Sequence, residues 1–471
     1  MQIVSDYNMR YIVRYLTKED VKTRRDDGSF CEFFQGDYLE EMLLWTDDKK
    51  GILYIGVGEE NLKDANVIKE LAAKACRELE KRKIYDFQAD ISAIVRAGNP
   101  EALKLFVLGL HLGSQGIKSY KHEKENTEYH VQLSGIESIT PENTEKQIEE
   151  GLCIGKSVQF ARDMVNKPGN LLRPEEFVNF ICEFLKDTSV EVEIRSGEAI
   201  NKMGAFMTVG SSSKFPPYLI LLRYRGNPDT QEITGLIGKG VTSDTGGYCL
   251  KSSKALIGNK GDMGGAAAVV GTVYALAMSK ARVNVTCVLP ICENRISDHS
   301  FLPGDVITSY SGTTIEIKNT DAEGRLILAD AMTVAVKEER VTRVLDIATL
   351  TGAVVVALGF TYTGVLCDNE VLWKEFIQAS NKSGEKFWRL PFDKEHIKML
   401  ETPIADIKNL GEDYCGTITA GLFVRHFAEN IPWIHLDIAG TAWLDTTYYE
   451  YQEKFATGAP IETLFEWLRT T

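Results

Sequence analysis

The sequence contains no C-x-x-C pair, and its nine cysteines (residues 31, 76, 153, 182, 249, 287, 292, 367 and 415) are scattered over 471 residues. An odd number without paired spacing favours buried, reduced thiols over a disulfide framework. The most apolar stretch, residues 266–278, is too short to span a bilayer, and no basic segment followed by an apolar one opens the chain. We therefore expect a cytoplasmic protein that is not bound to a membrane.

The sequence is also poor in histidine, with seven residues, and it has no excess of positive charge. Lys and Arg number 53 against 67 Asp and Glu, so the net charge of -14 repels phosphate backbones and anionic lipids. Nucleic acid is therefore not expected as the main partner. We find no repeats, no low-complexity segments and no phosphate-loop motif in its required context. The remaining composition, 44% hydrophobic and 25% charged, is that of an ordinary globular protein.

The length predicts two or more domains, because a single core seldom exceeds about 250–300 residues. The first third alternates apolar strands, predicted at 52–58 and 104–110, with a helix at 66–83, which indicates an α/β layer. The polar stretch 118–127 is predicted to be a surface loop. We place an N-terminal α/β domain at 1–142, a connecting helix at 143–166 and a second domain at 167–471.

Beyond residue 167, apolar strands continue to alternate with helices. This alternation is typical of a mainly parallel sheet covered by helices on both faces, so the predicted fold class is α/β. The clearest strands lie at 218–222, 283–290, 344–348 and 434–438, and the clearest helices at 263–279 and 323–338.

Four carboxylates are placed at the ends of three predicted elements in this second part of the chain. Asp244 follows the strand 235–241, Asp262 precedes a small-residue helix, and Asp321 and Glu323 begin another helix. Neighbouring glycines permit close backbone approach. Hard carboxylate oxygens that converge with few histidines bind Mg, Mn or Zn, and several of them together are typical of a two-metal centre that activates water.

Two lysines, Lys239 and Lys251, flank Asp244 in the sequence, and two interpretations of them remain open. Lysines commonly neutralise carboxylates in ion pairs. Alternatively, one amine is buried and deprotonated and binds a metal, while the other stays charged and polarises a carbonyl group. Spacing alone does not decide between these interpretations.

The run N-T-D-A-E-G-R-L-I-L-A-D-A-M (319–332) closely resembles the signature of the leucyl aminopeptidase, or cytosol aminopeptidase, family of dimetal exopeptidases. Its first eight residues are highly specific to that family. The likeness covers about residues 150–471 and is weak before that. Further matches follow in the family's order: N-K-P-G-N-L-L-R-P (166–174), G-K-G-V-T-x-D-x-G-G (238–247), D-M-G-G-A-A-A-V (262–269), D-I-A-T-L-T-G-A (346–353), G-T-I-T-A-G-L-F (416–423) and W-I-H-L-D-I-A-G-T-A-W (433–443).

The resemblance implies a metal-dependent aminopeptidase that releases N-terminal amino acids from peptides by attack of a hydroxide held by two divalent ions. Zn or Mn is the expected metal, with Mg or Co as alternatives. The family's ligands correspond here to Lys239, Asp244, Asp262 and Glu323 for one ion, and to Asp244, Asp321 and Glu323 for the other.

The resemblance also implies how the remaining site residues act. Lys251 would polarise the scissile carbonyl group, and Arg325 would hold a bicarbonate that serves as the general base. Thr349, Leu350 and Gly352 would bind the peptide substrate, whose free N-terminus the site recognises. The implied architecture is a catalytic domain with a mainly parallel sheet, a smaller macro-like N-terminal domain, and assembly into a homohexamer.

Three positions depart from the family pattern. Ser243 and Thr245 replace the usual Phe and Ser beside Asp244, and Asn259 replaces a Met of the first specificity pocket. An unpaired amide opposite an aliphatic side chain carries a desolvation cost on the order of 1–3 kcal/mol. We therefore expect a specificity shifted toward polar or small first residues. The same departures motivate the alternative hypothesis of a catalytically impaired member that acts as a scaffold or binding protein.

Overall fold

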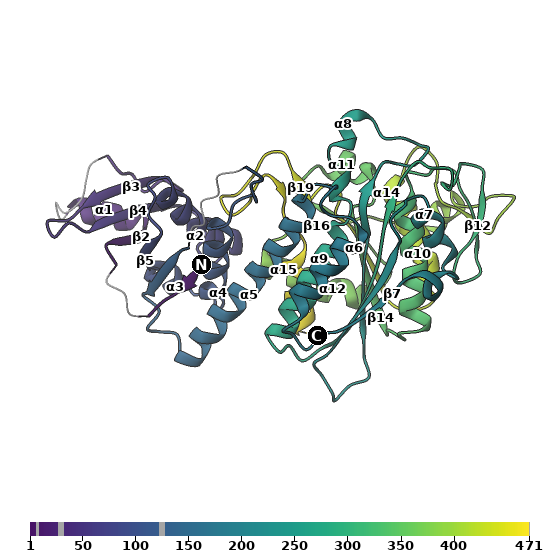
Figure 1. Cartoon of the computed structure of the whole chain (residues 1–471). Helices are drawn as coiled ribbons and strands as arrows, with labels where there is room; N and C mark the ends of the chain where they lie inside the picture. Colours follow the sequence, from purple (N-terminus) through teal and green to yellow (C-terminus); the bar gives the residue numbers. More distant parts are fainter. Residues whose placement is uncertain (6–8, 27–32, 122–127, 471) are drawn as a thin grey trace. The chain divides into compact units, whose positions relative to one another are not determined.

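The computed structural model describes residues 1–5, 9–26, 33–121 and 128–470 (Figure 1). The chain forms two compact units. The first comprises Met1–Gln159 and Thr446–Glu453, and the second comprises Phe160–Asp445 and Lys454–Thr471. Helix α5 (Pro141–Asn166) runs through the boundary between the units. The sequence-based boundaries placed 446–453 with the second domain, whereas this segment belongs to the first unit, where Gln452 O accepts a hydrogen bond from Arg77.

The first unit is built on a six-stranded sheet in the order β1-β6-β5-β2-β4-β3, in which only the edge pair β3–β4 is antiparallel. Its buried apolar core lies between this sheet and its helices. The strands are β1 (Gln2–Ile3), β2 (Tyr11–Thr17), β3 (Glu41–Trp45), β4 (Gly51–Gly58), β5 (Asp86–Asp90) and β6 (His130–Ser134), and the helices are α1 (Lys18–Asp26), α2 (Ala65–Glu80), α3 (Ser92–Arg96) and α4 (Ala102–Gly113).

The prediction of a strand at 104–110 is wrong, because these residues lie within helix α4. All twelve residues of α4 are buried, and the helix packs against α2 so closely that a Cβ atom on Gly109 would lie 2.6 Å from Lys69 Cα. A helix that is buried on every side has no polar face, so its sequence lacks the helical period and resembles a buried strand. In the predicted loop at 118–127, residues 122–127 lie outside the described residues.

The second unit contains a nine-stranded sheet in the order β16-β15-β18-β14-β9-β11-β8-β7, with β10 paired to β11. Its four central strands, β18, β14, β9 and β11, are mutually parallel, which confirms the predicted mainly parallel α/β fold. The strands are β7 (Glu191–Arg195), β8 (Tyr218–Arg225), β9 (Thr234–Gly238), β10 (Gly240–Asp244), β11 (Asn284–Asn294), β14 (Arg343–Ala348), β15 (Thr363–Cys367), β16 (Phe387–Arg389) and β18 (Trp433–Asp437).

Helices cover both faces of this sheet, as Figure 1 shows. On one face lie α6 (Pro174–Leu185), α9 (Gly264–Met278), α12 (Glu370–Ser383) and α15 (Ile461–Thr470), and on the other α7 (Gly204–Gly210), α10 (Glu323–Lys337) and α14 (Gly416–Arg425). Smaller elements are α8 (Ser253–Leu256), α11 (Gly352–Leu358), α13 (Lys394–Lys398), η1 (Gly197–Ile200), η2 (Asn259–Gly261), η3 (His426–Ala428), a three-stranded sheet of β12 (Val306–Thr308), β13 (Thr314–Glu316) and β17 (Ile407–Lys408), and the pair β19 (Trp443–Leu444) and β20 (Phe455–Ala456).

The predicted strand 235–241 is two strands, β9 and β10, with a break at Lys239. At the break, Lys239 N donates to Ile347 O at 3.0 Å, and its carbonyl accepts from Ala266 N at 2.9 Å. A Cβ atom on Gly238 would lie 2.6 Å from Ala266 Cα, so only glycine lets the start of α9 approach this closely. The break therefore places Lys239 beside the start of α9.

The helical stretch Asn259–Met278 is longer than the apolar run 266–278, because η2 precedes α9. By length and composition this longer stretch could cross a membrane, so the expectation drawn from 266–278 alone does not extend to the whole stretch. However, most of this stretch is buried inside the structure, where α9 packs against β9 and β14. That environment is typical of a core helix.

Candidate metal centre

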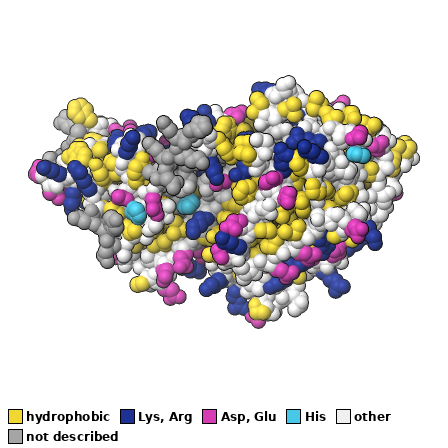
Figure 2. All heavy atoms as spheres, viewed as in Figure 1, with side chains coloured by type: hydrophobic (Ala, Val, Ile, Leu, Met, Phe, Trp, Pro, Cys, Tyr) yellow, Lys and Arg dark blue, Asp and Glu magenta, His cyan; other side chains and the backbone are white. Residues whose placement is uncertain are grey.

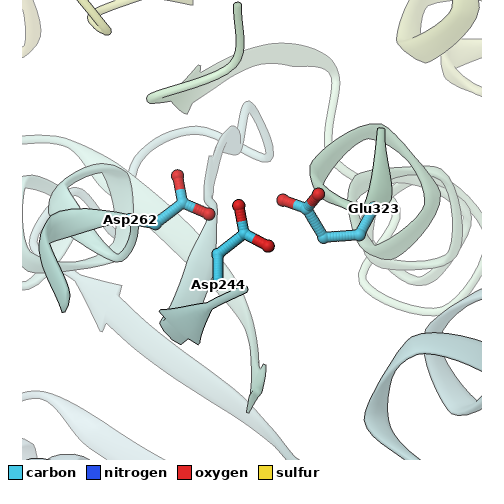
Figure 3. A group of neighbouring side chains, drawn as sticks. All are labelled: Asp244, Asp262 and Glu323. Carbon is cyan, nitrogen blue, oxygen red and sulfur yellow. The ribbon is translucent and has the colours of Figure 1, made fainter. Parts of the chain in front are cut away.

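Three carboxylates converge at the ends of different elements of the second unit. Asp244 ends β10, Asp262 lies between η2 and α9, and Glu323 is the first residue of α10. One oxygen of each lies within 4.8 Å of the others, and Figure 3 shows the three groups pointing toward one another. Within the described chain, Asp262 Oδ2 and Glu323 Oε2 are buried without a hydrogen-bond partner. Buried oxygens without a donor are the groups that a hard cation satisfies, so the donor set fits a divalent ion.

Lys239 extends its ammonium group into this cluster. Its Nζ lies 2.7 Å from Asp262 Oδ1 and 2.9 Å from Glu323 Oε1, and it donates to Thr349 O at 3.0 Å. Burial opposes the charge, but the neighbouring carboxylates outweigh burial and raise the pKa of Lys239. The ion-pair interpretation therefore describes this arrangement, and binding of a metal by Lys239 would require that the amine lose its proton.

Lys251 connects the cluster to the fourth carboxylate. Its Nζ lies 2.7 Å from Asp244 Oδ2 and also pairs with Asp321 Oδ1. Burial, together with the charges of Asp244 and Glu323, raises the pKa of Asp321 to about 6. Asp321 is thus joined to Asp244 through the Lys251 ammonium group, and the family resemblance assigns both of these carboxylates, together with Glu323, to a second ion.

The charges of the site do not balance. Burial raises the pKa values of Asp244 and Asp262. For Glu323, burial acts in the same direction, but the two lysines outweigh it and lower the pKa. Because four carboxylates face two ammonium groups, added positive charge would stabilise the ionised forms of the acids. The electrostatics therefore favour a cation at this position.

Arg325, in the first turn of α10, presents an unsatisfied donor to the same pocket. Its Nη1 donates to Asn409 O at 2.8 Å, while its Nε is buried and has no partner among the described residues. Burial lowers the pKa of Arg325 to about 10, so the guanidinium remains charged at neutral pH. An anion with several acceptor oxygens, such as bicarbonate, fits this donor.

All eleven site residues predicted from the sequence line one pocket of about 480 Å³. The charged ones are Lys239, Asp244, Lys251, Asp262, Asp321, Glu323 and Arg325, and the expected substrate-binding ones are Asn259, Thr349, Leu350 and Gly352. The rest of the wall includes apolar side chains, among them Val165, Val355, Ala442 and Trp443. The pocket is thus lined by two kinds of side chain. We call the seven charged residues its charged floor and the apolar residues its apolar wall.

Two of the positions that depart from the family pattern touch each other. Asn259 Nδ2 donates to Ser243 Oγ at 3.5 Å. Ser243 is buried in β10 immediately before Asp244, and Asn259 is half-buried at the start of η2. The polar side chain at each of these two positions therefore has a hydrogen-bond partner in the other.

Three residues that hold the site together were not singled out from the sequence. Asn294 Nδ2 donates to Asp244 Oδ1 and to Thr320 O. Asn409 accepts from the backbone N–H groups of Lys318 and Asn319, and Asp437 accepts hydrogen bonds from residues 350–351. Asn294 and Asp437 are the last residues of parallel strands, which is where open α/β sheets place their binding sites. This position could have identified both residues from the sequence. Asn409 follows the two-residue strand β17, which left no such signal.

The fold and the site together define a class of protein: an α/β protein with a pocket in which converging carboxylates could hold a divalent ion. A family model described as "Cytosol aminopeptidase family, catalytic domain" matches residues 159–465. The chain belongs to the cytosol aminopeptidase family, whose members are metal-dependent peptidases. This confirms the resemblance on which the sequence-based expectations rest.

Similar proteins match over most of their length. A probable cytosol aminopeptidase of Clostridium perfringens is 39% identical over 444 residues, which is 92% of this chain and 90% of that protein. One of Treponema denticola is 38% identical over 439 residues, 92% of each. Among solved structures, the bottromycin maturation enzyme BotP, also solved in complex with Mn, is 30% identical, with a TM-score of 0.87 and coverage of 98% of this chain and 99% of that one.

Proposed function

We propose that this protein removes N-terminal amino acids from peptides in a reaction that requires two divalent metal ions. The observation that carries the proposal is the convergence of Asp244, Asp262 and Glu323, from three separate elements, within one pocket that also contains Lys251. The apolar wall of that pocket gives room for a side chain of the substrate next to the charged floor.

We assign the metal ligands as the resemblance implies. Lys239, Asp244, Asp262 and Glu323 would hold one ion, and Asp244, Asp321 and Glu323 the other, with Zn or Mn as the expected metals and Mg or Co as alternatives. Divalent ions bound here would supply Lewis-acid polarisation and lower the pKa of water. The unpartnered oxygens of Asp262 and Glu323 support this assignment.

The remaining residues bind and orient the substrate. Lys251, whose pKa is raised by the surrounding carboxylates in spite of burial, keeps a positive charge that can stabilise negative charge developing on the scissile carbonyl oxygen. Arg325 would hold bicarbonate as the proton acceptor. Thr349, Leu350 and Gly352 would bind the peptide backbone, and Asn259 would contact the first side chain.

The test is hydrolysis of aminoacyl amides by metal-stripped protein reconstituted separately with Zn, Mn, Co or Mg. Glu323→Gln should abolish metal-dependent hydrolysis. Glu338→Gln, just beyond the other end of the same helix, is the matched control, because Glu338 pairs with Arg195 away from the pocket. Hydrolysis that is absent with every metal would reject the proposal and favour the catalytically impaired alternative.

A panel of Leu, Met, Ser, Asn and Gly amides tests the specificity proposed for Asn259. We expect kcat/KM to favour polar or small first residues relative to the Asn259→Met variant, because the Asn259–Ser243 pair makes this part of the wall polar. A strong preference for Leu in the wild type, unchanged in Asn259→Met, would show that Asn259 does not set specificity.

We further propose a cytoplasmic homohexamer, as the family resemblance implies. Exposed apolar side chains on the second unit support contacts between subunits: Val356 is 90% exposed, and Tyr362 packs edge-on against the exposed Trp388. On the face seen in Figure 2, acidic and basic side chains are interspersed, and we do not propose nucleic acid as a partner. Sedimentation velocity tests the assembly, and a monomer at micromolar concentration would reject it.

A further inference from the structure

Asp437, the last residue of β18, has a fully buried carboxylate that accepts four hydrogen bonds. Its Oδ1 accepts from the backbone N–H groups of Leu350 at 3.1 Å, Thr351 at 3.4 Å and Ala439 at 3.2 Å. Its Oδ2 accepts from Thr351 Oγ1 at 2.6 Å. Three of the four donors therefore belong to the turn between β14 and α11.

The other side of the same turn touches the candidate metal centre. Thr349 O accepts from Lys239 Nζ at 3.0 Å, and Thr349 Oγ1 donates to Asp262 Oδ1 at 2.7 Å. Residues 349–353 also line the pocket, whereas Asp437 does not. A single short segment thus connects the Asp437 carboxylate with the charged floor of the pocket.

We propose that Asp437 is a positioning residue that holds residues 349–352 in the conformation that receives the N-terminal part of a peptide substrate. The inference rests on the proposed aminopeptidase function. A buried carboxylate carries a desolvation cost that an apolar side chain at the end of β18 would avoid. Its four hydrogen bonds offset that cost, and three of them fix the turn that borders the pocket.

The expected effect follows from the fraction of protein in which the turn is correctly formed. Without the acceptor, the N–H groups of Leu350 and Thr351 lose their partner, and the turn samples other conformations. Apparent affinity falls in proportion to the binding-competent fraction, whereas the bound complex reacts as before. KM should therefore rise while kcat changes little.

A purely structural role must be separated from positioning, because Thr351 also accepts from Val354 N at the start of α11. Asp330 provides the matched control. It is likewise fully buried, and its carboxylate accepts from the backbone N–H groups of Phe206 at 2.9 Å and Tyr310 at 2.7 Å, away from the pocket. Asp330→Ala should lower stability without changing KM.

The experiment compares wild type, Asp437→Ala, Asp437→Asn and Asp330→Ala by hydrogen exchange and by amide hydrolysis with Mn²⁺. In Asp437→Ala, exchange should accelerate in the peptide that contains residues 350 and 351, and KM should rise at least about tenfold, which corresponds to 1.4 kcal/mol. Asp437→Asn retains an acceptor oxygen and should give intermediate values, which keeps the test valid if Asp437→Ala does not fold. In Asp330→Ala, exchange should accelerate only around Phe206 and Tyr310.

Two failures are distinguishable. Absence of hydrolysis by the wild-type protein with any metal would overturn the proposed function. An active wild type whose exchange at 350–351 and KM are both unchanged by Asp437→Ala and Asp437→Asn would overturn this inference alone. A rise in KM of similar size in Asp330→Ala would also overturn it, because the effect would then reflect general loss of stability.

Discussion

Asn294 donates a hydrogen bond from its side-chain Nδ2 to Asp244 Oδ1 at 2.9 Å and thereby ties the end of β11 to the end of β10. The same Nδ2 donates to Thr320 O at 3.0 Å, next to Asp321. Asp244 Oδ1 also accepts from Gly246 N at 2.9 Å. The orientation of the Asp244 carboxylate therefore depends on the side-chain amide of Asn294.

This arrangement predicts that Asn294→Ala weakens metal binding. Removal of a residue that orients a metal ligand typically lowers the affinity for the metal by about 10–100-fold. Calorimetric titration with Mn²⁺ measures the change. Asn284→Ala is the control, because Asn284 is a buried asparagine at the other end of the same strand, where it donates to Asn227 O and Thr230 O. Equal affinities for the two variants would show that Asn294 does not orient Asp244.

Metal removal should lower the stability of the wild-type protein. A ligand that binds only the folded state adds about 2.7 kcal/mol to the free energy of unfolding at a hundredfold excess over its Kd. We expect urea unfolding with Mn²⁺ and with chelator to differ by this order, and the difference to vanish in Asp262→Asn, which removes one of the converging charges. A difference that persists in the variant would place the stabilising ion elsewhere.

Gly324→Ala should reduce activity, and the loss of the buried Lys239 ion pairs should oppose any gain in stability from the alanine. A Cβ atom at this position would lie 2.6 Å from Lys239 Cε and 2.7 Å from its Nζ, so the ammonium group must leave its place between Asp262 and Glu323. Misplacement by about 1 Å in an active site can reduce the rate on the order of 100-fold. Alanine is also the better helix former by about 1 kcal/mol.

The measurement is kcat/KM together with the thermal midpoint of unfolding. Gly116→Ala serves as the control, because no atom lies within 4 Å of a Cβ added at that position. A Gly324→Ala variant with normal kcat/KM would indicate that the position of Lys239 is not important for turnover.

Asp330 predicts a pH dependence of stability away from the site. Burial raises its pKa to about 6, although the N–H groups of Tyr310 and Phe206 act in the opposite direction. In the unfolded chain the pKa is about 3.9. Between these values the folded state binds more protons, so stability falls as pH rises from about 4 to 6 and levels off above that.

The size of this effect follows from the pKa shift, at about 1.4 kcal/mol per unit, and is on the order of 3 kcal/mol. Asp330→Asn carries no titrating group, so the difference in unfolding free energy between wild type and variant should change across this window. Urea unfolding at pH 4, 5, 6 and 7 measures it. A constant difference at all four values would contradict the assigned shift.

The sequence predicted much of the second unit because its strands are short apolar runs bounded by turns. The predicted strand 344–348 lies in β14, and the prediction of 434–438 differs from β18 by one residue. The carboxylates were found because each stands at an element boundary, and parallel strands bring such boundaries to one edge of a sheet. The strand predicted at 104–110 was wrong because burial on all sides removes the helical period from α4.

The sequence by itself determined which types of charged side chain the site contains, their order along the chain and the elements that carry them. These follow from local pattern and from a highly specific motif. Only the tertiary structure decided which other side chains hold the site residues in place. Asn294 reaches Asp244 across 50 residues, and Asp437 reaches Leu350 across 87. Such contacts depend on the spatial order of the strands, in which β14 lies between β18 and β9, and no local pattern in the chain encodes that order.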